Sequence, residues 1–202
     1  MLVLDAAATF RERTENPLAF MLSALTHDMG KAVCTAMVKG ELHAYHHETE
    51  GLPLAERFVR RLTAQRDVLH YVLNMTENHM RPSTAAGARS AVKSTNRMFD
   101  QSADPRGLIC LALADGEGTL HPGRRFSIEK FLEERLAIYN ETMALPYVKG
   151  EDLAAAGIAP GPEFGEFLAF AHKLRLARVD KESALKQTLA YIDRYHRKNK
   201  TP

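Results

Sequence analysis

Apolar residues recur at steps of three and four along most of the chain, and alternating β-branched runs are nearly absent. That spacing is typical of helices with one apolar face rather than of strands. The expected helices, in chain order, cover residues 2–13, 17–30, 53–62, 67–80, 89–100, 105–114, 127–143, 163–178 and 181–198. The pattern therefore predicts an all-α protein.

Three stretches interrupt this helical pattern. A polar stretch after the second helix contains Lys-Gly at 39–40, and the short runs on either side, 35–38 and 42–45, are expected to pair as a hairpin. Arg-Pro-Ser at 81–83 predicts a loop, because proline tends to end helices. A connection is also expected over 116–125, which holds three glycines and a proline.

The character of the sequence changes near residue 145. From there, glycine and proline punctuate short segments before the last two helices, as is common where one folded part gives way to another. We therefore expect a larger domain over residues 1–144 and a small helical C-terminal part over residues 145–202.

Composition places the chain among ordinary globular proteins. With 27 Lys and Arg against 25 Asp and Glu, the net charge is only +2, so no overall attraction to nucleic acid is expected. No apolar run reaches the roughly 18–20 residues needed to cross a bilayer, which favours a cytoplasmic protein without a membrane partner. Local basic groups could still bind RNA, or could form a solvated face. They are Arg124, Arg125, Arg194, Arg197 and Lys198.

Histidines and a carboxylate gather early in the chain. His27 and Asp28 fall in the last turn of a predicted helix, and His43, His46 and His47 lie within five positions. Adjacent helical side chains project about 100° apart, so His27 and Asp28 reach one ion only over the helix end. Imidazole and carboxylate ligands suit borderline divalent ions. The grouping suggests a metal site, although a His-Asp dipeptide alone fits an exposed helix end equally well.

Two further residues stand at predicted helix ends. Asp115 follows the apolar run LALA and precedes a glycine, where an acid is either a turn former or a ligand. His79 is followed two residues later by Arg81, and the pair could face a phosphate or interact with the helix carbonyls. The residues alone leave both alternatives open.

The order His27-Asp28, a histidine-rich loop, His79 and Asp115 on an all-α chain resembles the HD phosphohydrolase superfamily. Within it, the chain most closely resembles the HD-containing bacterial CCA-adding tRNA nucleotidyltransferases. The strings that carry the likeness are LTHDMGKA, GELHAYHHETEG, PLAERFVRRL and ENHMRPS, and in the tail VKGEDLAAAGIAPGPEFGEFL. The tail string is the more specific, because many hydrolases share a His-Asp pair. The resemblance implies an HD-domain helical bundle with a small helical C-terminal appendage.

The resemblance also assigns roles to individual residues. It implies that His27, Asp28 and Asp115 hold a divalent ion, with Ni, Mn, Mg, Co and Zn all open. His46 stands where the family usually has glycine. The catalytic set that it implies is Asp28, His47, His79 and Lys31, where Lys31 would pair with a phosphate or with a neighbouring acid.

The chain departs from the family in two respects. The nucleotidyl-transfer head, with its Gly-Ser and Asp-x-Asp motifs, has no counterpart here, so this chain is not expected to add CCA by itself. The superfamily's first metal-binding histidine would fall just before Met1, so the first helix would be shortened and the metal set would be one ligand short. The chain therefore looks like the C-terminal part of such a protein.

Three hypotheses for function follow. The first is a metal-dependent HD phosphohydrolase that acts on phosphoesters such as nucleotides or 2′,3′-cyclic phosphates. The second is a non-catalytic module that binds tRNA or another RNA and works with a partner chain carrying the nucleotidyl-transfer head. In the third, the histidines are ordinary core and loop residues of a helical scaffold. Retention of the five-residue pattern favours the first, and the missing first histidine favours the second.

Overall fold

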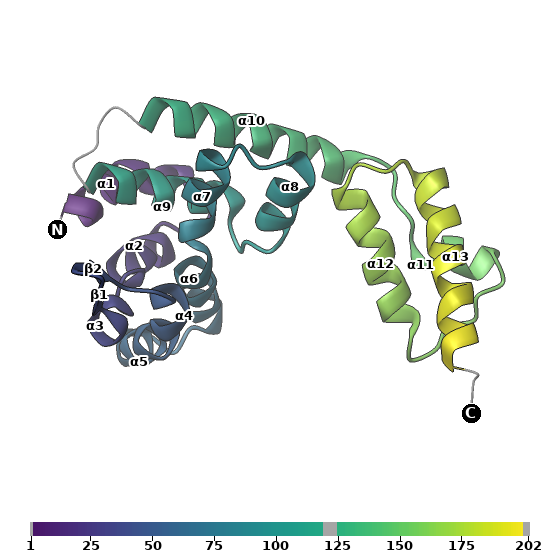
Figure 1. Ribbon diagram of the computed structural model, residues 1–202, viewed down its shortest axis with the longest axis horizontal. Helices are drawn as coiled ribbons and strands as arrows, with labels where there is room; N and C mark the ends of the chain where they lie inside the picture. The colour runs from purple at the N-terminus through teal and green to yellow at the C-terminus, as the bar shows by residue number, and fades with distance from the viewer. Residues whose placement is uncertain (1, 119–124, 200–202) are drawn as a thin grey trace. The chain divides into compact units, whose positions relative to one another are not determined.

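The structure is a computed structural model that describes residues 2–118 and 125–199 (Figure 1). Apart from one short hairpin, the described residues form helices, which confirms the predicted all-α fold class. Contacts divide the chain into two compact units, residues 1–136 and 137–202. Helix α10 (Arg125–Ala144) runs across this division. The domain boundary expected near residue 145 stays a prediction.

The first unit holds the helices that come before α10. They are α1 (Leu2–Phe10), α2 (Pro17–Thr26), α3 (Lys31–Cys34), α4 (His47–Glu50), α5 (Leu52–Leu62), α6 (Arg66–Asn78), α7 (Met80–Gly87), α8 (Val92–Asp100) and α9 (Pro105–Gly118), with a 3₁₀ turn at Arg11–Arg13. Helix α1 packs on α9, and α6 packs on both α2 and α5.

Helix α9 forms the centre of the first unit. Every residue from Gly107 to Ala114 is buried, as expected of a helix that is apolar on all sides. Burying each Leu or Ile side chain in this run contributes roughly 1.5–3 kcal/mol. The helix is therefore firmly held where it reaches Asp115, the first residue after the buried run.

Helix α2 begins where the sequence predicts and ends earlier. Asn16 caps it by accepting a hydrogen bond from the backbone N–H of Ala19 (3.0 Å), and Pro17 occupies its first turn. Buried residues such as Phe20 hold the helix against the core. The regular helix stops at Thr26, and a turn over residues 27–30 carries the His-Asp pair.

The predicted hairpin is present. Strands β1 (Ala36–Val38) and β2 (Glu41–His43) pair antiparallel, with Val38 opposite Glu41. Lys39 and Gly40 between them have φ values of 51° and 85°. Two consecutive residues with positive φ make a tight turn whose twist matches that of the strands.

The loop expected at 81–83 is wrong, because these residues lie inside α7. Pro82 occupies the first turn of that helix, where backbone N–H groups have no partner within the helix, so proline costs no hydrogen bond there. The connection expected from Gly116 also begins later, since α9 continues to Gly118.

The second unit contains α11 (Gly150–Ala155), α12 (Phe164–Leu176) and α13 (Lys181–Asn199). Helices α12 and α13 lie side by side, joined by a short turn (Figure 1). Leu153, Phe167 and Ile192 form the centre of their small apolar core. Over the residues that the structure describes, none of the helices is both long and apolar enough to cross a membrane.

Candidate metal centre

Five residues that are far apart in the sequence meet in the first unit. His27 and Asp28 follow the end of α2, and His47 opens α4. His79 joins α6 to α7, and Asp115 lies near the end of α9. The structure therefore brings together all of the residues predicted as metal ligands, along with the two histidines predicted as catalytic.

Asp28 lies at the centre of this cluster. Its Oδ1 is 3.2 Å from Nε2 of His47 and 3.8 Å from Nε2 of His79. Its Oδ2 is 3.3 Å from Nε2 of His27, which in turn lies 3.6 Å from Oδ1 of Asp115. The five residues thus form two groups that share Asp28: His27, Asp28 and Asp115, and Asp28, His47 and His79. Within each group the ligand atoms lie within 4.8 Å of one another.

The same local hydrogen bond orients all three imidazoles. Nδ1 of His27 lies 3.0 Å from the carbonyl oxygen of Ala24, and Nδ1 of His47 lies 2.9 Å from that of Ala44. Nδ1 of His79 lies 2.7 Å from the carbonyl of the residue three positions earlier. A carbonyl oxygen only accepts, so each Nδ1 carries a proton and donates it. Each Nε2 is thus directed into the cluster, where its lone pair can bind a metal ion when the imidazole is neutral, the arrangement found in metal-binding histidines.

Two features of the cluster call for a positively charged ligand. Nε2 of His47 and Nε2 of His79 are only 3.1 Å apart, a contact that needs either a proton or a metal ion between the two nitrogen atoms. Nε2 of His27 is buried and forms no hydrogen bond. A buried polar atom without a partner is costly. Three nitrogen atoms and two carboxylates fit a divalent cation, and the donor set contains no thiolate.

Electrostatics at the centre keep Asp28 charged and His79 neutral. Burial lowers the pKa of His79 to about 4, against the opposing hydrogen bond to Thr76. Burial disfavours the charged forms of His27 and Asp28, but their mutual attraction outweighs it. The carboxylates of Asp115 and Asp28 raise the pKa of His27 to about 9. His27 and Lys31 hold the pKa of Asp28 well below its usual range.

The cluster is closed on its histidine side and open on its carboxylate side. The His79 side chain is only 1% exposed, whereas that of Asp28 is 32% exposed. Nζ of Lys31 lies 2.6 Å from Oδ2 of Asp28, and half of the Lys31 side chain is exposed. Of the two partners predicted for Lys31, a phosphate or a neighbouring acid, the structure shows the acid. A ligand would approach across Asp28 and Lys31.

Two glycines that the sequence analysis did not single out set the position of His47. A Cβ atom at Gly30 would overlap the carbonyl oxygen of His47, and one at Gly51 would approach the same oxygen to 2.8 Å. The backbone N–H of Gly51 donates to that carbonyl at 2.9 Å. The turn after Asp28 and the start of α5 can approach this closely only because both residues lack side chains. The glycine that follows each histidine motif, in HDMG and HHETEG, was the available signal.

His46, directly before the ligand His47, adopts a left-handed conformation with φ 61°. The left-handed backbone conformation costs residues other than glycine roughly 1–2 kcal/mol of conformational energy. This strain explains why a glycine would suit the position better, as the resemblance implies. The left-handed residue turns the chain so that His47 opens α4 and faces the cluster.

The predicted RNA-binding residues lie away from this centre in the sequence. Arg124 lies outside the described residues, and Arg125 begins α10 with a side chain that is not described. Arg194, Arg197 and Lys198 are exposed near the end of α13 in the second unit. Their spacing of three and four residues places them on one face of the helix.

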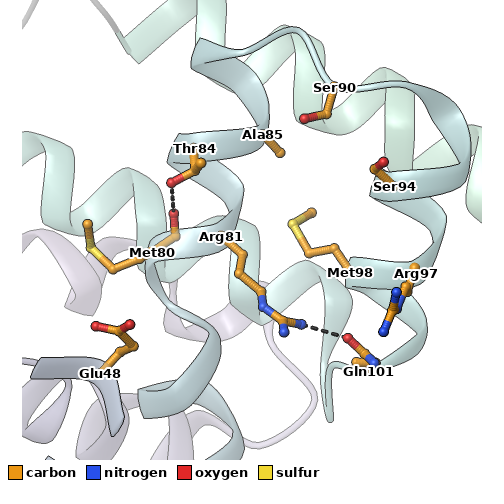
Figure 2. Close-up of a pocket in the computed structure, with 10 residues that line it drawn as sticks. All are labelled: Glu48, Met80, Arg81, Thr84, Ala85, Ser90, Ser94, Arg97, Met98 and Gln101. Carbon is orange, nitrogen blue, oxygen red and sulfur yellow. Dashed lines mark hydrogen bonds between the residues drawn. The ribbon is translucent and has the colours of Figure 1, made fainter. Parts of the chain in front are cut away.

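His79 and Arg81 do not act as a pair. His79 turns into the cluster, whereas Arg81 extends into a groove of about 600 Å³ between α7 and α8 (Figure 2). There its guanidinium donates a hydrogen bond to Oε1 of Gln101 at 2.7 Å. Glu48 lines the same groove, and its carboxylate lies 3.7 Å from Nδ1 of His47. The groove therefore has a carboxylate next to the cluster.

The fold and the cluster define an all-α chain with a candidate centre for divalent metal. Two curated proteins are similar to it, both called Multifunctional CCA protein, from Actinobacillus pleuropneumoniae serotype 5b (strain L20) and serotype 7 (strain AP76). Each is 33% identical over 79 residues, which is 39% of this chain and 19% of the relative. No family model matches the chain, and no solved structure matches it. Part of the chain is thus similar to these Multifunctional CCA proteins, and the match spans about a fifth of their length.

Proposed function

We propose that this chain is a metal-dependent phosphohydrolase of the HD type, acting on phosphoesters such as nucleotides or 2′,3′-cyclic phosphates. One observation carries the proposal: three buried imidazoles point their Nε2 atoms at two carboxylates. A helical scaffold has no need of such a cluster, because burying several ionisable side chains together costs stability. The partial likeness to CCA proteins supports a substrate related to RNA or nucleotides.

Each residue of the cluster has a distinct role in this proposal. His27, Asp28 and Asp115 would hold one divalent ion, and Asp28, His47 and His79 would hold a second. When bound, such an ion supplies an activated water and offsets the charge that develops on phosphoryl oxygens. Lys31 lies at the open edge, where its ammonium group can bind a phosphate oxygen of the substrate while holding Asp28.

Hydrolysis of 2′,3′-cyclic AMP and of p-nitrophenyl phosphate tests this proposal. We expect the wild-type chain to hydrolyse at least one of them with one of Ni, Mn, Mg, Co or Zn. Replacing His79 with Gln should lower kcat/KM at least about a hundredfold, the scale seen when one charge-stabilising group is lost.

His70 offers a matched control for this substitution. It lies on α6, is exposed and takes no part in the cluster. His70→Gln should leave kcat/KM within twofold of the wild-type value. Equal activity in the two variants, or no hydrolysis with any of the five metals, would remove the proposal.

A second candidate function is binding of tRNA on behalf of a partner that carries a nucleotidyl-transfer head. The partial likeness to CCA proteins and the exposed basic face near the end of α13 favour it. We expect Arg197→Glu to weaken tRNA binding at least tenfold at low salt, and modest salt to abolish wild-type binding, because phosphate contacts release counterions. Lys186→Glu, at an exposed position further up the same helix, is the control. The idea fails if tRNA does not bind at low salt, or if both variants bind alike.

A further inference from the structure

A second groove begins at the candidate metal centre itself. It holds about 350 Å³ and lies between the turn after α2, helix α3 and helix α5. Asp28 lines it directly, so its inner end is the open carboxylate side of the cluster. Its other lining residues are Met29, Ala32, Leu54, Arg57, Phe58 and Arg61. We call it the α5 groove.

Two arginines give the α5 groove a positive charge. Arg57 and Arg61 are four residues apart on α5 and so lie on one face of the helix. Neither forms an ion pair or a side-chain hydrogen bond with any residue that the structure describes. Arg60 on the same helix, by contrast, binds Glu56 at 2.7 Å. Two neighbouring guanidinium groups without an acidic partner repel each other, and an anion that contacts both would relieve this repulsion.

Apolar side chains line the same groove. Leu54 and Phe58 are half-buried and lie on α5 close to the two arginines. The Phe58 ring makes no ring contact within the described part of the chain. An aromatic face beside a guanidinium is a surface on which a nucleobase stacks. The combination of an apolar floor, two arginines and an adjoining metal cluster fits one chemical class of ligand, a nucleotide.

The groove at α7 and α8 is less suited to that ligand. Of its two arginines, Arg81 and Arg97, the first is already bonded to Gln101 (Figure 2). Glu48 also lines this groove, and its carboxylate lies 3.7 Å from Nδ1 of His47. A phosphate entering from the cluster would meet that carboxylate first. Among the described residues that line the α5 groove, Asp28 is the only acid beside the two arginines.

We propose that the α5 groove binds the nucleotide unit next to the reacting phosphate, with a second phosphate on Arg57 and Arg61 and a base against Leu54 and Phe58. The ligand then carries at least two phosphates, either in an oligonucleotide end or in a nucleoside polyphosphate. That the first phosphate reacts at Asp28 rests on the proposed function. Binding of the second phosphate does not, because it needs only the groove.

Fluorescence anisotropy of a 5′-fluorescein RNA tetranucleotide, titrated with the full chain in EDTA, tests the groove without any hydrolysis. Arg57→Gln/Arg61→Gln should raise the dissociation constant at least tenfold. Loss of two phosphate contacts to a single strand should also reduce the slope of log K against log salt by about 1.4. Arg60→Gln/Arg66→Gln removes the same charge from exposed positions outside the groove and should change binding less than twofold.

Competition distinguishes the two sources of the second phosphate. Displacement of the RNA by ATP but not by AMP identifies a nucleoside polyphosphate, and resistance to both identifies an oligonucleotide. The proposal is overturned if the wild-type chain binds neither the RNA nor a fluorescent ATP analogue, or if the two double variants bind alike. Arginine-dependent RNA binding without hydrolysis under any metal would remove the proposed function and leave the groove standing. Hydrolysis without arginine-dependent binding would support the proposed function and remove the proposal for the groove.

Discussion

The Asp28→Asn variant is expected to lose divalent metal completely, because Asp28 belongs to both groups of ligands. Oδ1 faces His47 and His79, and Oδ2 faces His27, so a single amide replacement removes a charged ligand from each group. Partners that merely orient a ligand are worth roughly 10–100-fold in metal affinity. The loss of a shared ligand should exceed that range.

Elemental analysis after exposure to Ni, Mn, Mg, Co or Zn and removal of excess ion measures the result. Near-stoichiometric metal is expected in the wild-type chain and none in Asp28→Asn. Asp115→Asn and His79→Gln should each retain part of the metal, because each belongs to one group only. Asp67→Asn, at an exposed position in the first turn of α6, is the control and should bind metal normally.

Three results would contradict this interpretation. Wild-type protein without metal would mean that the cluster does not bind these ions. Equal metal content in the wild-type and Asp28→Asn chains would place the ion elsewhere. Complete loss in Asp115→Asn as well as in His79→Gln would show one joint site rather than two groups that share Asp28.

Helical periodicity was enough to predict the fold class, whereas the members of the cluster were predicted from the resemblance to the HD superfamily. Apolar spacing places His27, His79 and Asp115 near the ends of helices, although α9 continues past Asp115 to Gly118. The error at Pro82 has a similarly local cause. Proline ends a helix in its interior but is tolerated in its first turn, and the sequence pattern does not say which position it occupies.

Features that depend on contacts between distant segments could not be predicted. The close approach of Gly30 to Gly51, which positions His47, joins two segments whose spacing carries no motif. The carbonyl acceptors that orient the imidazoles depend on the turn geometry at each site. Arg57 and Arg61 look in the sequence like the solvated face of an amphipathic helix. Only the fold shows that their groove begins at Asp28.

Asp104 holds the start of α9, and its replacement is the second change expected to have a large effect. Its buried carboxylate accepts hydrogen bonds from the backbone N–H of Glu15 (2.9 Å), from the hydroxyl of Tyr71 (2.9 Å) and from the backbone N–H of Gly107 (2.7 Å). Burial and the charge of Asp104 raise the pKa of Tyr71, which keeps its hydroxyl protonated as a donor. One side chain thus ties α9 to α6 and to the segment before α2.

In Asp104→Ala, these three donors lose their shared acceptor inside the core. Each buried donor left without an acceptor costs about 1–3 kcal/mol, so the loss of all three should lower the free energy of unfolding by at least about 3 kcal/mol. Urea denaturation measures it. Tyr71→Phe keeps the ring and removes only one of the three bonds, and should cost about 1.5–3 kcal/mol, the scale of a hydrogen bond to a charged group.

Comparison of Asp104→Ala with Tyr71→Phe distinguishes the loss of this hydrogen-bond network from a general loss of core packing. If Tyr71→Phe costs as much as Asp104→Ala, the backbone donors of Glu15 and Gly107 contribute nothing, and the carboxylate does not hold the start of α9. Unchanged urea midpoints in both variants would exclude the network altogether. Because α9 also carries Asp115, any metal that binds only the folded chain should restore stability to Asp104→Ala by mass action. The metal should not restore stability to the double variant Asp104→Ala/Asp28→Asn. That difference would show that the core at one end of α9 is coupled to the cluster at the other end.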